Sequence, residues 1–290
     1  MSTLEVNKEQ LLSHLKEVAG NNNKIAGIVC HTPLYLNQDN GSEVQPYYQY
    51  QFEGNIVVWV NPLILSTKDK TFSCARIFVM GRRRHNELLA TARHFAGLVS
   101  FLSHNAVMIE AKHTQGSLND PRLDLLEMSQ GSFLLDKYVF ISNGSNIGDI
   151  LDVACSPHYP VDEQGILALS HILEASSSFS IYWTYLCYWK ILEILHGRVR
   201  RGQGGGGIST YLDSNVPLNH NQQDWVNRHS STYRRLYGTR NAVGHWRNDR
   251  EPTVRDPADE RLRERVEKDL PILWIFVRYS LNPKFGLRAY

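Results

Sequence analysis

The hydrophobic pattern of this 290-residue chain changes its period near Val161, and this change constrains the fold more than any other feature. Before it, short runs rich in Val, Ile, Tyr and Phe alternate with turn residues, which is typical of β-strands. After it, apolar residues recur at the roughly 3.6-residue spacing of helices that bury one face. The sequence therefore predicts an α+β protein: a small mixed α+β domain over residues 1–158 and an all-α bundle over residues 159–290.

The first domain is expected to contain one small sheet and several helices. Glu53-Gly54-Asn55 is suited to a hairpin turn, because Gly and Asn tolerate the backbone angles that such turns need. The predicted helices are 4–18, 86–103 and 122–128, and the predicted strands are 25–31, 47–52, 56–60, 72–80, 107–111 and 138–142. We expect this domain to recognise a partner or to regulate the second domain.

The second domain is expected to be a bundle of helices. The predicted helices cover 162–175, 179–195, 221–236 and 258–281, with a turn at 176–178 and a kink or boundary at Pro271. The aromatic helix 179–195 is apolar almost all round, so it should lie at the centre. Within it, Lys190 and Glu193 are three residues apart and can pair on one helix face. Alternatively, Glu193 reaches Arg240 and fixes its orientation.

Catalytic chemistry is suggested by the segment Arg240-Asn241-Ala-Val-Gly-His245. Arginine offers a planar fork of donors to phosphate oxygens, and histidine exchanges protons near neutral pH. Residues five apart on a helix diverge by about 140°, so convergence of Arg240 and His245 requires a break that Gly238 and Gly244 could supply. The spacing thus predicts a loop-to-helix junction with Asn241 near the N-cap. The alternative is that Arg240 pairs with a core carboxylate and His245 is an ordinary packed or surface histidine.

The arrangement of these segments resembles a HEPN domain. An aromatic helix that ends in Lys190-x-x-Glu193 is followed by a loop, a helix and then Arg240-Asn241-x-x-x-His245, which fits the R-x4-6-H motif of that family over residues 160–282. The resemblance implies an all-α HEPN-like bundle, metal-independent ribonuclease activity and a homodimer whose two motifs share one cleft. The whole chain also resembles the proteins grouped as methylamine utilisation protein MauJ, a label that refers to gene neighbourhood.

The resemblance implies a role for each residue of the motif. His245 would move protons, Arg240 would stabilise charge on the phosphoryl oxygens, and Asn241 would orient the histidine or the phosphate. The expected activity is endonucleolytic cleavage of single-stranded or looped RNA, in a toxin or antiviral-defence effector with an antitoxin or activator as a further partner. Two alternatives stay open: a non-catalytic RNA-binding, nucleotide-binding or dimerisation module, and an accessory protein of a metabolic operon.

Positive charge is concentrated around the motif. The chain has a net charge of only +2, but residues 198–250 contain nine Arg, no Lys and three Asp. A phosphate-bearing partner would be drawn to this segment, and the predicted substrate-binding residues are Arg198, Arg200, Arg201 and Arg247. The first three belong to a glycine-rich loop that either closes over RNA or only links two helices. Trp225, Tyr233 and Tyr237 either stack on bases or fill the core.

Other classes of site have weak sequence support. The four cysteines (Cys30, Cys74, Cys155, Cys187) form no C-x-x-C pair, which favours a reducing compartment and argues against a zinc site. No metal or cofactor is expected. The N-terminus lacks the layout of a signal peptide and segment 179–195 is too short and charged to span a membrane, so a cytoplasmic location is expected. The basic cluster 81–85 either holds a phosphate or is a solvated corner.

Overall fold

The computed structural model describes residues 7–32, 46–67, 70–103, 107–123, 125, 147–159, 161–178, 180–197, 207–214, 218–244 and 259–287. These residues form an α+β protein, as predicted, with an antiparallel sheet in the first half and helices in the second. Contacts divide the chain into two compact units. We call Met1–Asp162 with Phe285–Leu287 the N-terminal unit, and Glu163–Lys284 with Arg288–Tyr290 the helical unit.

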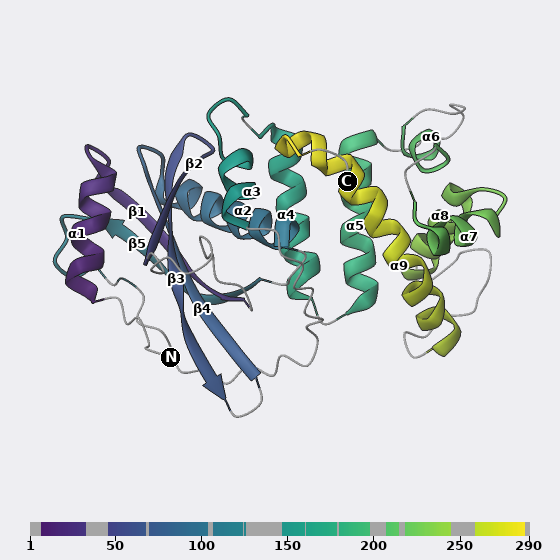
Figure 1. Cartoon of the computed structure of the whole chain (residues 1–290), viewed down its shortest axis with the longest axis horizontal. Helices are drawn as coiled ribbons and strands as arrows, with labels where there is room; N and C mark the ends of the chain where they lie inside the picture. Colours follow the sequence, from purple (N-terminus) through teal and green to yellow (C-terminus); the bar gives the residue numbers. More distant parts are fainter. Residues whose placement is uncertain are drawn as a thin grey trace. The chain divides into compact units, whose positions relative to one another are not determined.

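The N-terminal unit is built on one five-stranded sheet (Figure 1). Every neighbouring pair of strands in it is antiparallel. The strands lie in the order β2 (Tyr47–Phe52), β3 (Asn55–Thr67), β4 (Lys70–Gly81), β1 (Lys24–Thr32) and β5 (Met108–Ser117). All five were predicted, but β3, β4 and β5 are longer than expected because each pairs with a neighbour beyond its apolar run.

Helices α1 (Lys8–Ala19) and α2 (His85–Ser103) cover opposite sides of this sheet (Figure 1). Side chains alternate along β1, so Ile25 and Val29 pack with α1 whereas Ile28 is buried on the other face. Both faces are therefore apolar, and the strand is buried from Ile25 to His31. This explains why β1 reads as a continuous run of small and apolar residues rather than a polar-apolar alternation.

The β2–β3 hairpin also ties the sheet to α2. Glu53 and Gly54 form its two-residue turn with φ of 51° and 70°, which matches the primed turns of tight hairpins and confirms the predicted turn. The carboxylate of Glu53 is nearly buried and lies 2.6 Å from Nδ1 of His94. It also accepts a hydrogen bond from Thr91 Oγ1 at 2.9 Å. Glu53, a non-glycine residue with a left-handed backbone conformation, is thus held in place by contacts with α2, about forty residues later in the sequence.

Part of the predicted structure of this unit is wrong or lies outside the described residues. The helix predicted for 122–128 does not begin at Arg122, because Pro121 and Arg122 form a turn that the carboxylate and carbonyl of Asp120 close. Residues 126–128 and the strand predicted at 138–142 lie outside the described residues. The helix α3 (Ile147–Ala154) was not predicted.

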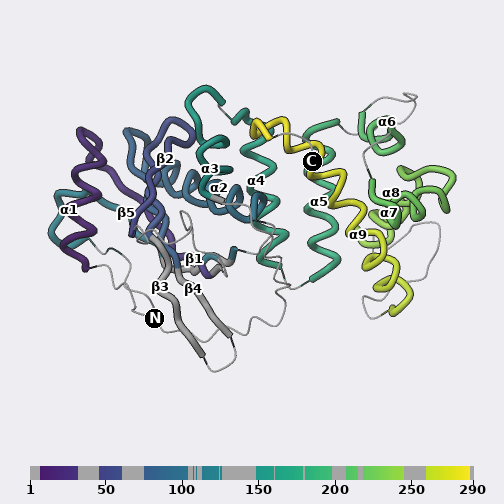
Figure 2. Tube along the Cα trace, viewed as in Figure 1, coloured from purple at the N-terminus to yellow at the C-terminus, as the bar shows by residue number. Residues whose placement is uncertain are grey.

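The helical unit is organised around α5 (Ile181–His196), as the apolar pattern predicted. α5 packs against α4 (Glu163–Ser177), α6 (Ile208–Leu212), α8 (Thr232–Gly244) and α9 (Glu260–Leu281). The trace in Figure 2 shows α6, α7 (His220–Asn227) and α8 grouped beside α9, where the four elements line a common cavity. A short 3-10 helix, Asn282–Phe285, follows α9.

Three boundaries in the helical unit differ from the predictions. The helix predicted at 221–236 is two helices, because α7 ends at Asn227 and α8 begins at Thr232. Asp213 stabilises this start by accepting hydrogen bonds from the Tyr233 backbone N–H at 3.0 Å and from the Ser231 hydroxyl. The turn expected at 176–178 begins later than predicted, because α4 continues to Ser177. Pro271 does not mark a helix boundary, because α9 continues through it.

Candidate functional site

The helix α8 carries the described part of the predicted motif. Arg240 and Asn241 lie near its C-terminal end, so the prediction of a loop-to-helix junction with Asn241 at an N-cap is wrong. Gly238 is also helical and serves a different purpose from the one expected. A Cβ at Gly238 would lie 2.9 Å from Nη2 of Arg265, so the glycine lets an arginine of α9 lie against α8.

Arg240 directs its guanidinium toward the C-terminal end of α8. Its Nη1 donates a hydrogen bond to Asn241 Oδ1 at 3.1 Å. A Cβ built on Gly244 would lie 3.9 Å from the same Nη1, which places the guanidinium beside the residue that precedes His245. Asn241 therefore orients the arginine. His245 itself lies outside the described residues, as do the predicted substrate-binding residues Arg198, Arg200, Arg201 and Arg247.

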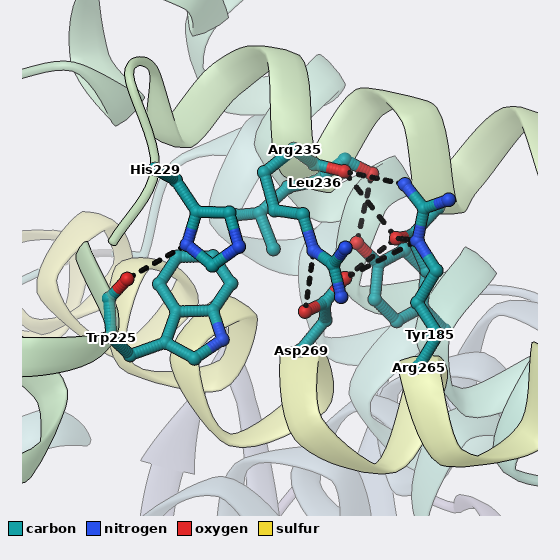
Figure 3. Close-up of polar contacts among 8 residues, drawn as sticks. Tyr185, Trp225, His229, Arg235, Leu236, Arg265 and Asp269 are labelled. Atoms are coloured by element: carbon teal, nitrogen blue, oxygen red, sulfur yellow. Dashed lines mark hydrogen bonds and ion pairs between the residues drawn. The ribbon is translucent and has the colours of Figure 1, made fainter. Parts of the chain in front are cut away.

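A buried carboxylate fixes α8 against α9. Asp269 has a side-chain exposure of 0%, and its Oδ1 accepts a hydrogen bond from Arg235 Nε at 3.1 Å. Its Oδ2 accepts one from Thr239 Oγ1 at 2.6 Å and lies 4.0 Å from Arg265 Nε. Figure 3 shows Arg235 of α8 and Arg265 of α9 converging on Asp269. Charge-assisted hydrogen bonds of this kind are strong, so they set the position of the helix that presents Arg240.

Arg265 completes this network, which we call the Asp269 cluster: Arg235, Thr239, Arg265 and Asp269. The Nε of Arg265 donates to Thr239 Oγ1 at 2.6 Å and its Nη2 donates to the Arg235 carbonyl at 3.3 Å. The hydroxyl of Thr239 therefore accepts from an arginine while it donates to the aspartate. Both arginines of the cluster keep about a quarter to a third of their side chains exposed (26% and 32%), so the buried charge is connected to the surface.

Tyr185 ties the central helix α5 to the same region of α8. Its hydroxyl donates to the Leu236 carbonyl at 2.9 Å, and its ring is fully buried (Figure 3). Burial raises the pKa of Tyr185 well above its usual value, and the negative charge of Asp269 raises it further. The phenol therefore stays protonated and keeps donating its hydrogen bond at any physiological pH.

Aromatic side chains form a surface on the α5 side of α8. The rings of Tyr233 and Tyr237 stack with centroids 5.3 Å apart and an interplanar angle of 19°, and the ring of Trp189 lies 5.8 Å from that of Tyr237. Tyr237 is 40% exposed, whereas Trp189 is buried. Trp225 belongs to a different contact, in which its ring lies 4.5 Å from that of His229. We call Trp189, Tyr233 and Tyr237 the aromatic surface.

Charges from two helices act on Tyr233 in this surface. Its pKa is raised first by burial and then by the nearby Tyr237 and Glu193, whereas Arg240 lowers it. Glu193 of α5 and Arg240 of α8 therefore both lie within electrostatic range of one phenol. The predicted intrahelical pair is present, because Lys190 Nζ lies 3.5 Å from Glu193 Oε2, and Trp189 Nε1 donates to the other oxygen at 3.1 Å. A contact between Glu193 and Arg240 stays a prediction.

Two other features could serve as sites, the basic cluster 81–85 and a cavity in the helical unit. In the basic cluster 81–85 the three arginines are exposed, while His85 begins α2 and its Nε2 donates to the Gly116 carbonyl at 2.9 Å. A cavity of about 300 Å³ lies among α6–α9, with Asp213, His229 and Phe276 in its lining. The carboxylate of Asp213 is already engaged by the start of α8, so this cavity offers less polar chemistry than its lining suggests.

Sequence reasoning missed the Asp269 cluster and Tyr185. Asp269 is preceded by Arg265 at i−4, a spacing that does indicate a pair on one helix face. Nothing local indicates its burial or its bond to Arg235, 34 positions away.

Comparison of the chain with models of protein families, with curated proteins and with solved structures found no match. Among the described residues, none of the helices combines the length and the apolar character needed to cross a membrane.

Proposed function

We propose that the protein is a metal-independent endoribonuclease of the HEPN type, which cleaves single-stranded or looped RNA as a homodimer through Arg240, Asn241 and His245. One observation carries the proposal. The guanidinium of Arg240 is oriented by Asn241 and lies beside Gly244, the residue that precedes His245. A phosphate-binding fork thus lies beside Gly244, and the proposed proton-transfer group is the next residue in the sequence.

The proposed reaction moves one proton and exchanges one bond at phosphorus. The 2′-oxygen of the ribose attacks the adjacent phosphorus while His245 accepts its proton. The bond from phosphorus to the 5′-oxygen then breaks, and the protonated His245 returns that proton to the leaving 5′-oxygen. Negative charge accumulates on the non-bridging oxygens, which the planar donor fork of Arg240 stabilises. The products are a 2′,3′-cyclic phosphate and a 5′-hydroxyl.

The aromatic surface supports RNA as the substrate. Tyr237 is exposed and its stacked partner Tyr233 keeps the ring in place, so a flipped-out base could stack on it. Such a surface binds single-stranded or looped RNA without much sequence preference, because every base has an aromatic face. A base on Tyr237 would bring the flanking phosphates toward the arginines of α8.

The proposal is tested by incubating the full chain with total RNA and with a structured RNA in EDTA, and by reading the fragment ends. Wild-type protein should release fragments that end in 2′,3′-cyclic phosphates, and His245→Ala should release none while it still folds and binds RNA. Full activity of the His245→Ala protein would exclude this mechanism. Salt-dependent binding without cleavage by the wild type would favour the second candidate, a non-catalytic RNA-binding module, which the aromatic surface alone would support.

Tyr237→Ala should weaken binding of single-stranded RNA by about 1–3 kcal/mol, because the stacking surface for one base is lost. The affinity should be measured at one fixed salt concentration in the His245→Ala background, so that cleavage does not interfere. Trp183→Ala is the matched control, since Trp183 is an aromatic residue of α5 with a similar exposure of 46%. An equal loss in both variants would show that Tyr237 has no specific role in base stacking.

A further inference from the structure

Helices α4 and α5 bring together three side chains that could hold a metal ion. His171 and Glu174 lie three residues apart on α4, and Cys187 lies on the neighbouring α5. One ligand atom from each, an imidazole nitrogen, a carboxylate oxygen and the Sγ, lies within 4.8 Å of the other two. No local spacing indicates this group, because its cysteine and histidine come from different helices.

Cys187 and Glu174 are hydrogen-bonded to each other, but one polar atom of His171 is not satisfied. Nδ1 of His171 is buried and has no hydrogen-bond partner, and the nearest oxygen of Glu174 lies 3.5 Å from it. A buried polar atom without a partner destabilises a folded protein, so native structures rarely contain one. A ligand that accepts the lone pairs of all three atoms would remove this cost.

The protonation states are compatible with such a ligand. Burial lowers the pKa of His171, an effect that Lys190 reinforces and Glu174 opposes, so the imidazole is neutral and carries a free lone pair. Burial raises the pKa of the Cys187 thiol to about 12, and the charge of Glu174 raises it further. Without a metal the thiol is protonated, and a metal that binds there must displace this proton.

We propose that His171, Glu174 and Cys187 bind one zinc ion between α4 and α5. A thiolate, an imidazole and a carboxylate together suit zinc, whereas magnesium and calcium prefer oxygen ligands alone. Zinc bonds of about 2.0–2.3 Å place tetrahedral ligand atoms roughly 3.5 Å apart, so the three side chains must move closer. Glu174 can move because 48% of its side chain is exposed, and this exposure leaves the fourth position open to water.

The positive charge of Lys190 acts on this site, since it lowers the pKa of His171. Its pairing with Glu193 at 3.5 Å offsets part of its repulsion toward a bound metal. Zinc at this position would join α4 to the central helix and stabilise the helical unit. The site uses none of the residues of the proposed ribonuclease reaction, so the two proposals stand independently.

The test uses the full chain, stripped with a chelator and then titrated separately with zinc and with cobalt. Wild-type protein should bind one equivalent of zinc, its melting temperature should rise, and cobalt should produce the near-ultraviolet charge-transfer band of a thiolate ligand. Cys187→Ser should lose this band and bind zinc at least about 100-fold more weakly, since loss of even a residue that only hydrogen-bonds to a metal ligand costs about 10–100-fold. Cys155→Ser, which removes a buried cysteine of the N-terminal unit, should keep both properties.

Glu174→Gln provides a second test if Cys187→Ser fails to fold, because Glu174 is half-exposed and its replacement leaves the core unchanged. This variant should bind zinc at least about tenfold more weakly than the wild type. Absence of zinc binding by the wild-type chain would overturn the proposal. A thiolate–cobalt band that persists in Cys187→Ser would overturn it equally, as would an unchanged zinc affinity in Glu174→Gln.

Discussion

Arg240→Ala should lower the rate of the proposed RNA cleavage by about 10²–10³-fold, the usual cost of removing one group that stabilises charge in a transition state. The protein should remain folded, because Arg240 lies near the end of α8 and does not belong to the Asp269 cluster. Arg240→Lys should recover only part of the activity, since lysine keeps the charge but lacks the planar fork. Single-turnover cleavage rates and melting temperatures of the three proteins would measure these effects.

Arg234→Ala is the matched control for this prediction. Arg234 is an exposed residue of the same helix, so its replacement removes the same formal charge from the same region. Its cleavage rate should stay within a few-fold of the wild type at moderate salt, because a distant charge acts mainly through screened attraction. If both variants lose activity equally, Arg240 contributes general attraction for RNA and the proposed catalytic role is wrong.

Asp269→Ala destabilises the helical unit by about 3–5 kcal/mol, because it leaves Arg235 and Thr239 without the buried carboxylate that they contact at 3.1 and 2.6 Å. The loss should appear as a lower denaturant midpoint for unfolding of this unit. Asp269→Asn should lose less, since an amide keeps the shape and one acceptor. RNA cleavage should fall in proportion to the folded fraction.

Glu267→Ala, on the same helix, separates this effect from any general loss of negative charge. Glu267 pairs with Arg263 at 2.9 Å, but both side chains are about half exposed or more (49% and 66%). Surface pairs of this kind contribute roughly 0–1 kcal/mol, so the variant should unfold almost like the wild type. Equal destabilisation by both replacements would mean that the burial of Asp269 adds nothing.

Much of the fold follows from local patterns in the sequence. The strand Tyr47–Phe52 and the helix beginning at His85 were found within a residue of their bounds, since alternation and helical spacing are local properties. The central place of α5 followed from its apolar surface. The extension of β3 to Thr67 was not predicted, because it depends on pairing with β4. Such pairing depends on two segments and cannot be inferred from the pattern of one.

The geometry of the candidate site was predicted less well, for a physical reason. The motif was recognised, but its helix begins where it does because Asp213, about twenty residues earlier, accepts the Tyr233 backbone N–H. Gly238 suggested a break, yet it is helical and leaves room for the guanidinium of Arg265 from another helix. Contacts between distant segments decide both features, and no spacing within residues 237–246 contains that information.

The same limitation applies to the buried polar residues. Cys187 lies in an apolar run and is buried, but its approach to His171 and Glu174 depends on the packing of α4 against α5. Tyr185 was recognised only as part of an apolar helix, although its hydroxyl reaches the Leu236 carbonyl. Hydrophobic periodicity shows which residues face inward, whereas the partners they meet depend on the tertiary structure.

The Asp269 cluster also bears on how genetic data for this protein would be interpreted. In a selection for variants that have lost activity, changes at Asp269 or Thr239 would be recovered as readily as changes at Arg240. Changes at Asp269 or Thr239 act by preventing the correct placement of α8. Sequence position would not distinguish the two classes, since Thr239 and Arg240 are adjacent. Protein abundance would separate them: variants of the cluster should be depleted from the soluble fraction, while variants of Arg240 should accumulate normally.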